Sequence, residues 1–201
     1  MSDQIEIGRL LRSSTGGFVV GCRVDQLELP SFGALVRAAL GNDYQVFGLI
    51  HDIHIGDDGL VRQIVTAENV SPEVVSDNRE RRVVPVELSV LALGYQHRGE
   101  LHHALPPRPP VSLDLIYLCD EPAVRAFTPP GRYAYLRLLL AVPDLPIPQL
   151  LAAHIRQAAA AHADPAGWKA GAVRELVLQL RGDYSTLTSV LDALHEAPVD
   201  L

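Results

Sequence analysis

Histidine side chains are the groups of this sequence best suited to acid–base or metal chemistry, because their pKa lies near neutrality and both ring nitrogens can bind a metal. Two of the eight, His51 and His54, stand three residues apart, and the segment DIHIGDDG places acidic residues near His54. The surrounding pattern predicts a strand, in which these two rings point to opposite faces and do not readily chelate one ion. The acidic residues lack the alternating oxygen ligands of a calcium loop. We predict no metal site, and His51 and His54 mark where an unrecognised active site would be sought.

The other candidate histidines are also predicted to be unreactive. His102 and His103 are adjacent, so their rings diverge in an extended chain. His154 and His162 are eight residues apart in a predicted helix and have no acidic or cysteine companion at ligand spacing. We expect all four to be surface or partly packed residues.

Motifs for covalent or phosphoryl chemistry are missing from the sequence. No Gly-x-Ser-x-Gly elbow supports a hydrolase nucleophile. A phosphate-binding loop needs a lysine followed by Ser or Thr, but Lys169, the only lysine, precedes Ala170. Cys22 and Cys119 are too few and too far apart for a zinc site or a disulfide framework. These observations predict a protein that is not an enzyme and has no cofactor.

The composition predicts a folded cytoplasmic protein. A chain of 201 residues that is 48% hydrophobic can bury a real core. A net charge of -7 gives no general attraction to nucleic acid or anionic membranes. The N-terminus has no export signal, and Arg137 and Pro143 interrupt the longest apolar stretch, so no membrane span is expected. The bias toward arginine, alanine, leucine and proline is typical of a bacterial coding sequence rich in G and C.

The first 120 residues contain short segments with the composition of β-strands, separated by turn residues. Clear examples are IEIGRLL, FVVGCRV, QVFGLIHDIHI, LVRQIVTA, RRVVPVELSVLALGY and SLDLIYLC. Glycines such as Gly8, Gly33 and Gly48 lie inside or beside them and are expected to mark bulges and corners. We predict a small, closed or nearly closed β-barrel of about six strands. Pro85 is expected at an edge or a bulge, because it cannot donate a ladder hydrogen bond.

The chain changes character after residue 120. Residues 147–163, 165–182 and 184–196 repeat apolar residues at helical spacing, and a helix is favoured for 133–142. Asp183 or Ser185 is expected to cap the last helix. Residues 122–131 resemble a linker. The predicted class is therefore α+β, with a β domain over 1–120 and a bundle of three or four helices over 121–201.

The β half resembles a known barrel family. The runs IEIGRLLRSSTGGFVVGC, FGALVRAA, QVFGLIHDIHI and VELSVLALGYQHRGELHHALPPRPPVSLDLIYL follow the order seen in the HAS-barrel, the N-terminal barrel of HerA-type DNA translocases. The resemblance covers roughly residues 5–120 and depends on these pieces together. It implies ring assembly or partner docking. The P-loop ATPase core that follows the barrel in that family is absent, so the resemblance implies no motor activity for this chain.

Two binding functions remain open from the sequence. The favoured one is a non-enzymatic assembly or docking protein, an accessory of a HerA-like ATPase or its nuclease in DNA processing or repair, with homo-oligomerisation as a further expectation. Arg79, Arg81 and Arg82 form the best local basic patch for a partner or nucleic acid. The alternative is an OB-like nucleic-acid-binding module. Its aromatic and basic groups would come from Phe18, Phe32, Tyr44, Phe47, Arg9, Arg12, Arg23 and Arg37, although core packing is favoured for the phenylalanines.

Overall fold

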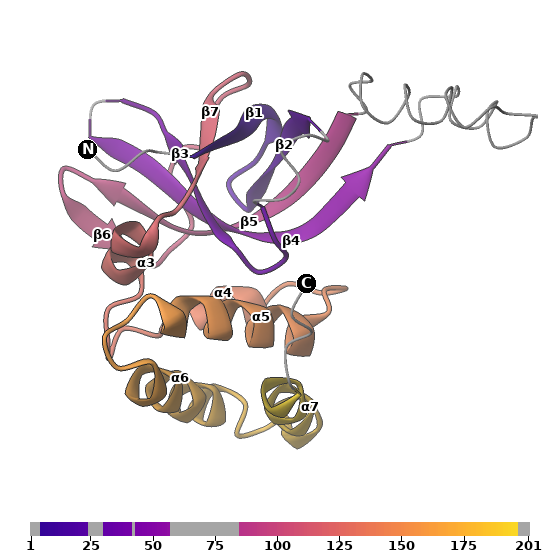
Figure 1. Ribbon diagram of the computed structural model, residues 1–201, viewed down its shortest axis with the longest axis vertical. Helices are drawn as coiled ribbons and strands as arrows, with labels where there is room; N and C mark the ends of the chain where they lie inside the picture. The colour runs from indigo at the N-terminus through magenta and orange to yellow at the C-terminus, as the bar shows by residue number, and fades with distance from the viewer. Residues whose placement is uncertain (1–4, 24–29, 42, 57–84, 197–201) are drawn as a thin grey trace, which may run out of the picture.

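The computed structural model describes residues 5–23, 30–41, 43–56 and 85–196, and it has a β half followed by a helical half (Figure 1). The strands are β1 (Glu6–Ser13), β2 (Gly17–Arg23), β3 (Leu35–Ala39), β4 (Tyr44–Ile55), β5 (Pro85–His97), β6 (Glu100–His102) and β7 (Leu115–Leu118). The helices are α3 (Glu121–Phe127), α4 (Leu136–Leu140), α5 (Ile147–Ala160), α6 (Pro165–Gln179) and α7 (Tyr184–His195). The predicted α+β class is confirmed. The predicted strand LVRQIVTA lies outside the described residues.

Six strands close into an antiparallel barrel, as predicted. Around the ring the order is β1, β2, β5, β4, β3 and β7, and β7 pairs with β1 to complete the circle. The short strand β6 lies outside the ring and pairs with the last residues of β5. Closure satisfies the backbone groups that an open sheet would leave at its edges. Among the described strands, β6 is therefore the one that presents a sheet edge.

One bulge on each strand bends the β4–β5 pair around the barrel: Leu93 is the extra residue on β5 and His51 is the extra residue on β4. The β4–β5 register shifts between Phe47 and Gly48, and again between Ile50 and Asp52. Gly48 is required at the first shift, because a Cβ there would lie 2.8 Å from the carbonyl oxygen of Leu91. Pro85 was expected at an edge or a bulge, and the pairing of β5 with β4 ends at Val86, which leaves Pro85 with a register partner on β2 alone. Pro85 is the first residue of β5, a position that tolerates a missing N–H, and it pairs with β2.

Alternation along the strands builds two cores from one sheet. Inward side chains such as Val36, Val46 and Ile50 fill the barrel. Their neighbours Leu35 and Phe47 point outward and are also buried, because they pack against the helices. Apart from bulges, successive strand residues face opposite sides, so a wall of the barrel that is covered on both faces reads as a continuous apolar run.

The helices form two layers below the barrel. In Figure 1, α4 and α5 lie next to the barrel and α6 and α7 lie beyond them. Asp183 caps α7 as predicted, its carboxylate accepting a hydrogen bond from the Thr186 N–H at 3.0 Å. The linker predicted at 122–131 is wrong in its first part, which forms α3 after the capping residue Asp120. Across the described residues, no helix is both long and apolar enough to cross a membrane.

A buried histidine joins the barrel to the helices, which corrects the expectation that His154 is a surface or partly packed residue. The His154 side chain on α5 is only 1% exposed. Its Nδ1 lies 3.3 Å from the Gly33 carbonyl oxygen, and its Nε2 lies 2.9 Å from the Tyr135 hydroxyl. A carbonyl can only accept, so Nδ1 carries the proton and Nε2 accepts a hydrogen bond from Tyr135. The imidazole is therefore neutral and fully satisfied.

Candidate functional site

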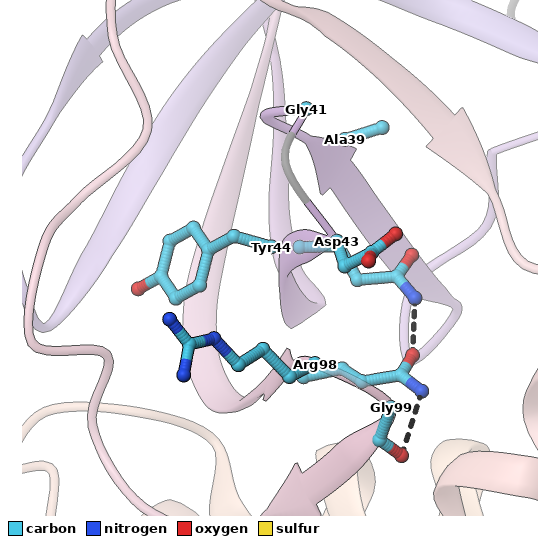
Figure 2. Close-up of a pocket in the computed structure, with 8 residues that line it drawn as sticks. Ala39, Gly41, Asp43, Tyr44, Arg98 and Gly99 are labelled. Atoms are coloured by element: carbon cyan, nitrogen blue, oxygen red, sulfur yellow. Dashed lines mark hydrogen bonds between the residues drawn. The ribbon is translucent and has the colours of Figure 1, made fainter.

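Two hairpin turns of the barrel enclose a polar hollow of about 560 Å³ (Figure 2). One turn joins β3 to β4 and the other joins β5 to β6. The backbone N–H of Arg98 in the second turn donates to the Asp43 carbonyl in the first, at 3.1 Å. The lining includes Asp43, Tyr44, Gln45, Gln96, Arg98 and Gly99. These side chains bring charge and hydrogen-bonding groups to one place on the barrel.

The β5–β6 turn holds an arginine in a conformation that usually belongs to smaller residues. His97 and Glu100 pair across the hairpin, which leaves Arg98 and Gly99 as the two turn residues. Their φ angles are 52° and 82°, the positive values of a type I′ turn. Asn, Asp and Gly are favoured at the first of these positions, because other residues meet steric strain there. Arg98 keeps its long side chain at the hollow despite that strain.

A directed chain of hydrogen bonds crosses the hollow. Arg37 donates from Nη1 to Gln45 Oε1 at 3.3 Å, and Gln45 Nε2 donates to Gln96 Oε1. Gln96 Nε2 then donates to the Gly99 carbonyl at 3.2 Å (Figure 2, dashed lines). The direction is fixed, because a guanidinium cannot accept and a carbonyl cannot donate. Each side-chain nitrogen of the two glutamines therefore retains one N–H beyond those in the chain.

Tyr44 forms one side of the hollow and is held by its neighbours. Its hydroxyl donates to the Arg108 carbonyl at 2.9 Å, and the Arg108 guanidinium carbon lies 6.0 Å from the ring centroid. Burial raises the pKa of the Tyr44 hydroxyl, while the hydrogen bond to Arg108 and the charge of Arg108 oppose the rise. In Figure 2 the Arg98 guanidinium extends toward the Tyr44 ring. The Arg108 guanidinium therefore lies over this ring, and Arg98 lines the same hollow.

More positively charged than negatively charged side chains lie around the hollow. Arg98 lines it, Arg108 stands over Tyr44, and Arg37 holds the amide of Gln45. Among the described residues that line the hollow, Asp43 is the acidic one. No described carboxylate forms an ion pair with Arg98. The hollow is thus a locally basic, donor-rich site on a chain whose net charge is -7.

The histidines singled out in β4 are not grouped with further metal ligands among the described residues. The ring of His51 is half-buried at the second bulge, whereas His54 is exposed. Burial lowers the pKa of His51, and the charge of Asp52 opposes that shift. Within residues 5–23, 30–41, 43–56 and 85–196, no group of three or more His, Cys, Asp or Glu side chains is placed to hold a metal ion. Asp57 and Asp58 lie outside these ranges.

The adjacent pair His102 and His103 diverges, as predicted. His102 stacks on Tyr95 with ring centroids 4.7 Å apart. His103 turns toward α3 and donates from Nε2 to the Phe127 carbonyl at 2.8 Å. His162 packs against Trp168 with ring centroids 5.2 Å apart, so it is the partly packed residue that was expected. Each of these three rings has a structural role.

The predicted nucleic-acid surface is only partly visible. Phe18 and Phe47 are buried, which confirms the prediction that these two rings pack in the core. Arg12 forms an ion pair with Glu87 at 2.9 Å, and Arg9 donates to the Leu113 carbonyl at 3.2 Å. The basic patch predicted at Arg79, Arg81 and Arg82 lies outside the described residues. Tyr44 and Arg37 are the members of the predicted set that reach the hollow or its hydrogen-bond chain.

The hollow itself was not predicted from the sequence. The turn at Gly99 could be recognised from the sequence His97-Arg98-Gly99-Glu100, because a glycine between two strand-like segments is typical of a hairpin turn. Gln45 and Gln96, however, are 51 residues apart, and only the β4–β5 register places them opposite each other. The signal that could have found the site is the arginine directly before that turn glycine.

Comparison with known proteins gives no assignment. No family model matches this sequence, and no curated protein is significantly similar to it.

Proposed function

We propose that this chain is a non-enzymatic docking protein, which serves as an accessory of a HerA-like ATPase in DNA processing or repair. The partner contacts the barrel around the hollow between the β3–β4 and β5–β6 turns. The resemblance of residues 5–120 to the HAS-barrel supplies the class of partner.

One observation carries the docking function. The described residues that line the hollow offer an arginine, two amides, a phenol and a carboxylate, and none of them is His, Cys, Ser, Thr or Lys. Such a lining can bind and orient, whereas the usual nucleophiles and histidine bases are not among its residues. Loops and turns on a rigid scaffold are also where binding groups concentrate.

The test is direct binding between the purified chain and the HerA-like ATPase and nuclease of the same organism. We expect a complex at micromolar concentrations, detected by interferometry and by mass in solution. Arg98→Asn should weaken it about tenfold, because the variant removes a charged hydrogen-bond donor from the interface.

A matched control separates the site from general charge. Arg181→Asn also removes one exposed guanidinium, but from the turn after α6, and should bind the partner like the wild type. If the wild-type chain binds neither the ATPase nor the nuclease, the docking function is wrong.

A second candidate is single-stranded nucleic-acid binding, which the position of Tyr44 favours. An aromatic ring with Arg98 and Arg108 nearby has the components of a stacking platform with phosphate contacts. This function predicts that labelled oligothymidylate binds at low salt and is released as salt rises. Absence of binding at low salt would eliminate it.

A further inference from the structure

We propose that the hollow recognises a carboxylate in an acidic peptide segment, with Arg98 as its charged partner and the amides of Gln45 and Gln96 as further donors. This inference rests on the proposed docking function and specifies the chemistry that the hollow selects in its partner.

The first argument is the direction of the hydrogen-bond chain. Arg37 at one end and the Gly99 carbonyl at the other force both glutamine oxygens into the chain. Each glutamine then keeps one N–H, which can donate to an acceptor group of a ligand, and one further lone pair on its oxygen. A carboxylate supplies two oxygens with several lone pairs and is the protein side chain that best fits a set of donors.

The second argument is the conformation of Arg98. This residue occupies a left-handed turn position, with φ 52°, where Asn or Gly would fit with less strain. A non-glycine residue held in such a conformation supports a functional hypothesis when its side chain lines a site. The guanidinium also has no carboxylate partner among the described residues, so it is available to an incoming one.

The third argument is size and charge. A hollow of about 560 Å³ is in the range of sites that hold a small organic ligand. An isolated carboxylate would leave most of that space empty, whereas a peptide segment would fill it. Asp43 opposes an anion, and the arginines at positions 37, 98 and 108 outnumber it. The geometry therefore points to an acidic segment over a basic one.

The experiment uses the full chain and three capped pentapeptides. Each has the form Gly-Ser-X-Ser-Gly, acetylated and amidated, with X as Glu, Gln or Lys, so that the only differing group is the central side chain. Each peptide is titrated to millimolar concentration and followed by ¹H–¹⁵N NMR. We expect the Glu peptide alone to shift the side-chain amide signals of Gln45 and Gln96 and the backbone signals of Arg98 and Gly99.

Two variants with opposite expected effects on the affinity for the Glu peptide give a sharper test. Arg98→Asn should weaken binding of the Glu peptide about tenfold, since a charge-assisted hydrogen bond is lost. Asp43→Asn should strengthen it about threefold, since a nearby like charge is removed while the turn keeps a residue that tolerates positive φ. Arg98→Asn should melt no lower than the wild type, because Asn is favoured at this turn position. The Arg181→Asn control should bind the Glu peptide like the wild type.

Several results would overturn the inference. If the Gln peptide caused the same shifts as the Glu peptide, the hollow would not recognise the negative charge of the carboxylate. Preference for the Lys peptide, weakened by Asp43→Asn, would show that the hollow selects a cation. Tighter binding of oligothymidylate at the same signals would assign the site to phosphate. An absence of shifts with every ligand would show that the hollow does not bind them.

The outcomes also separate this inference from the docking function. If the HerA-like ATPase binds equally well to the wild type and to Arg98→Asn, and the Glu peptide causes no shifts, docking stands and carboxylate recognition fails. If the Glu peptide binds as expected but neither the ATPase nor the nuclease does, carboxylate recognition stands and the proposed partner is wrong.

Discussion

His154 shows how a single side chain can make the stability of this fold depend on pH. Burial lowers its pKa to about 4, and the hydrogen bond to the Gly33 carbonyl only partly opposes that shift. Protonation would place a charge at the junction of barrel and helices and would remove the acceptor for the Tyr135 hydroxyl. The folded state therefore binds this proton less readily than the unfolded chain does.

The pH dependence follows from the direction of this shift. The contribution of His154 is complete above the unfolded pKa of 6.5 and is lost as the pH falls toward 4, where the loss reaches about 3 kcal/mol. Denaturant titrations between pH 7 and 4 should show this decline in the free energy of unfolding. In His154→Gln, which can donate to Gly33 and accept from Tyr135, the decline should be smaller.

The His154→Gln comparison is needed because other histidines contribute in the same direction. Burial also lowers the pKa values of His51, His103 and His162. If the wild type and the variant lose stability in parallel over this pH range, the buried imidazole of His154 is not the responsible group.

At the scale of elements, the contact between α5 and the segment that precedes β3 depends on one glycine. Gly33 has φ 83°, and a Cβ there would lie 2.9 Å from the His154 backbone nitrogen and 2.7 Å from the Ala153 Cβ. Gly33→Ala should lower the free energy of unfolding by about 2–4 kcal/mol, because it combines left-handed strain with a clash against α5.

Gly131→Ala is the matched control for this substitution. Gly131 has the same φ of 83°, but nothing lies within 4 Å of its added Cβ. Its substitution should cost only the conformational part, about 1–2 kcal/mol. Chemical denaturation of both variants tests the difference, and equal losses would show that α5 yields to the extra methyl group.

Much of the element pattern could be predicted from the sequence, because local periodicity determines it. Alternating apolar residues located the strands of the barrel, and helical spacing located α5, α6 and α7. The helix α3 was missed because seven residues are too few to show a clear period, although Asp120 and Pro122 are typical start signals. His154 was assigned to a helix but not to the core, because its hydrogen bond to the Gly33 carbonyl joins residues 121 apart and leaves no local signal.

The candidate site was less predictable for a related reason. A turn can be recognised from a glycine, yet the partners that a turn meets are set by long-range strand register. One bulge in β5, at Leu93, and one in β4, at His51, shift that register, and no local signal in the sequence marks either of them. Gln45 and Gln96 therefore come together only in the folded barrel.

At the scale of the whole molecule, one of the two apolar cores is shared between the outer wall of the barrel and the helices. Outward residues of the barrel wall, among them Phe47, Leu49 and Leu93, belong to the same buried cluster as Leu150 and Trp168 of the helices. Separating the two halves would expose these side chains to water, at about 25 cal/mol for each Å² of apolar surface. The two halves are thus expected to depend on each other for stability.

This shared core predicts a single cooperative unfolding transition. Trp168, the only tryptophan and 2% exposed, reports on the helical half by fluorescence. Backbone amide signals of β1 and β5 report on the barrel by NMR in the same urea titration. The midpoints should coincide. Loss of the tryptophan signal before the barrel signals would show that the helices unfold independently.

The hydrogen-bond chain from Arg37 to Gly99 has a consequence for how the hollow tolerates mutation. Its direction is specified twice, by a guanidinium that can only donate at one end and a main-chain carbonyl that can only accept at the other. Every residue keeps its carbonyl, so substitution of a side chain can break this chain but cannot reverse it. The polarity of the hollow is therefore robust to genetic drift, and a switch from acceptor ligands to donor ligands would require rebuilding the turn.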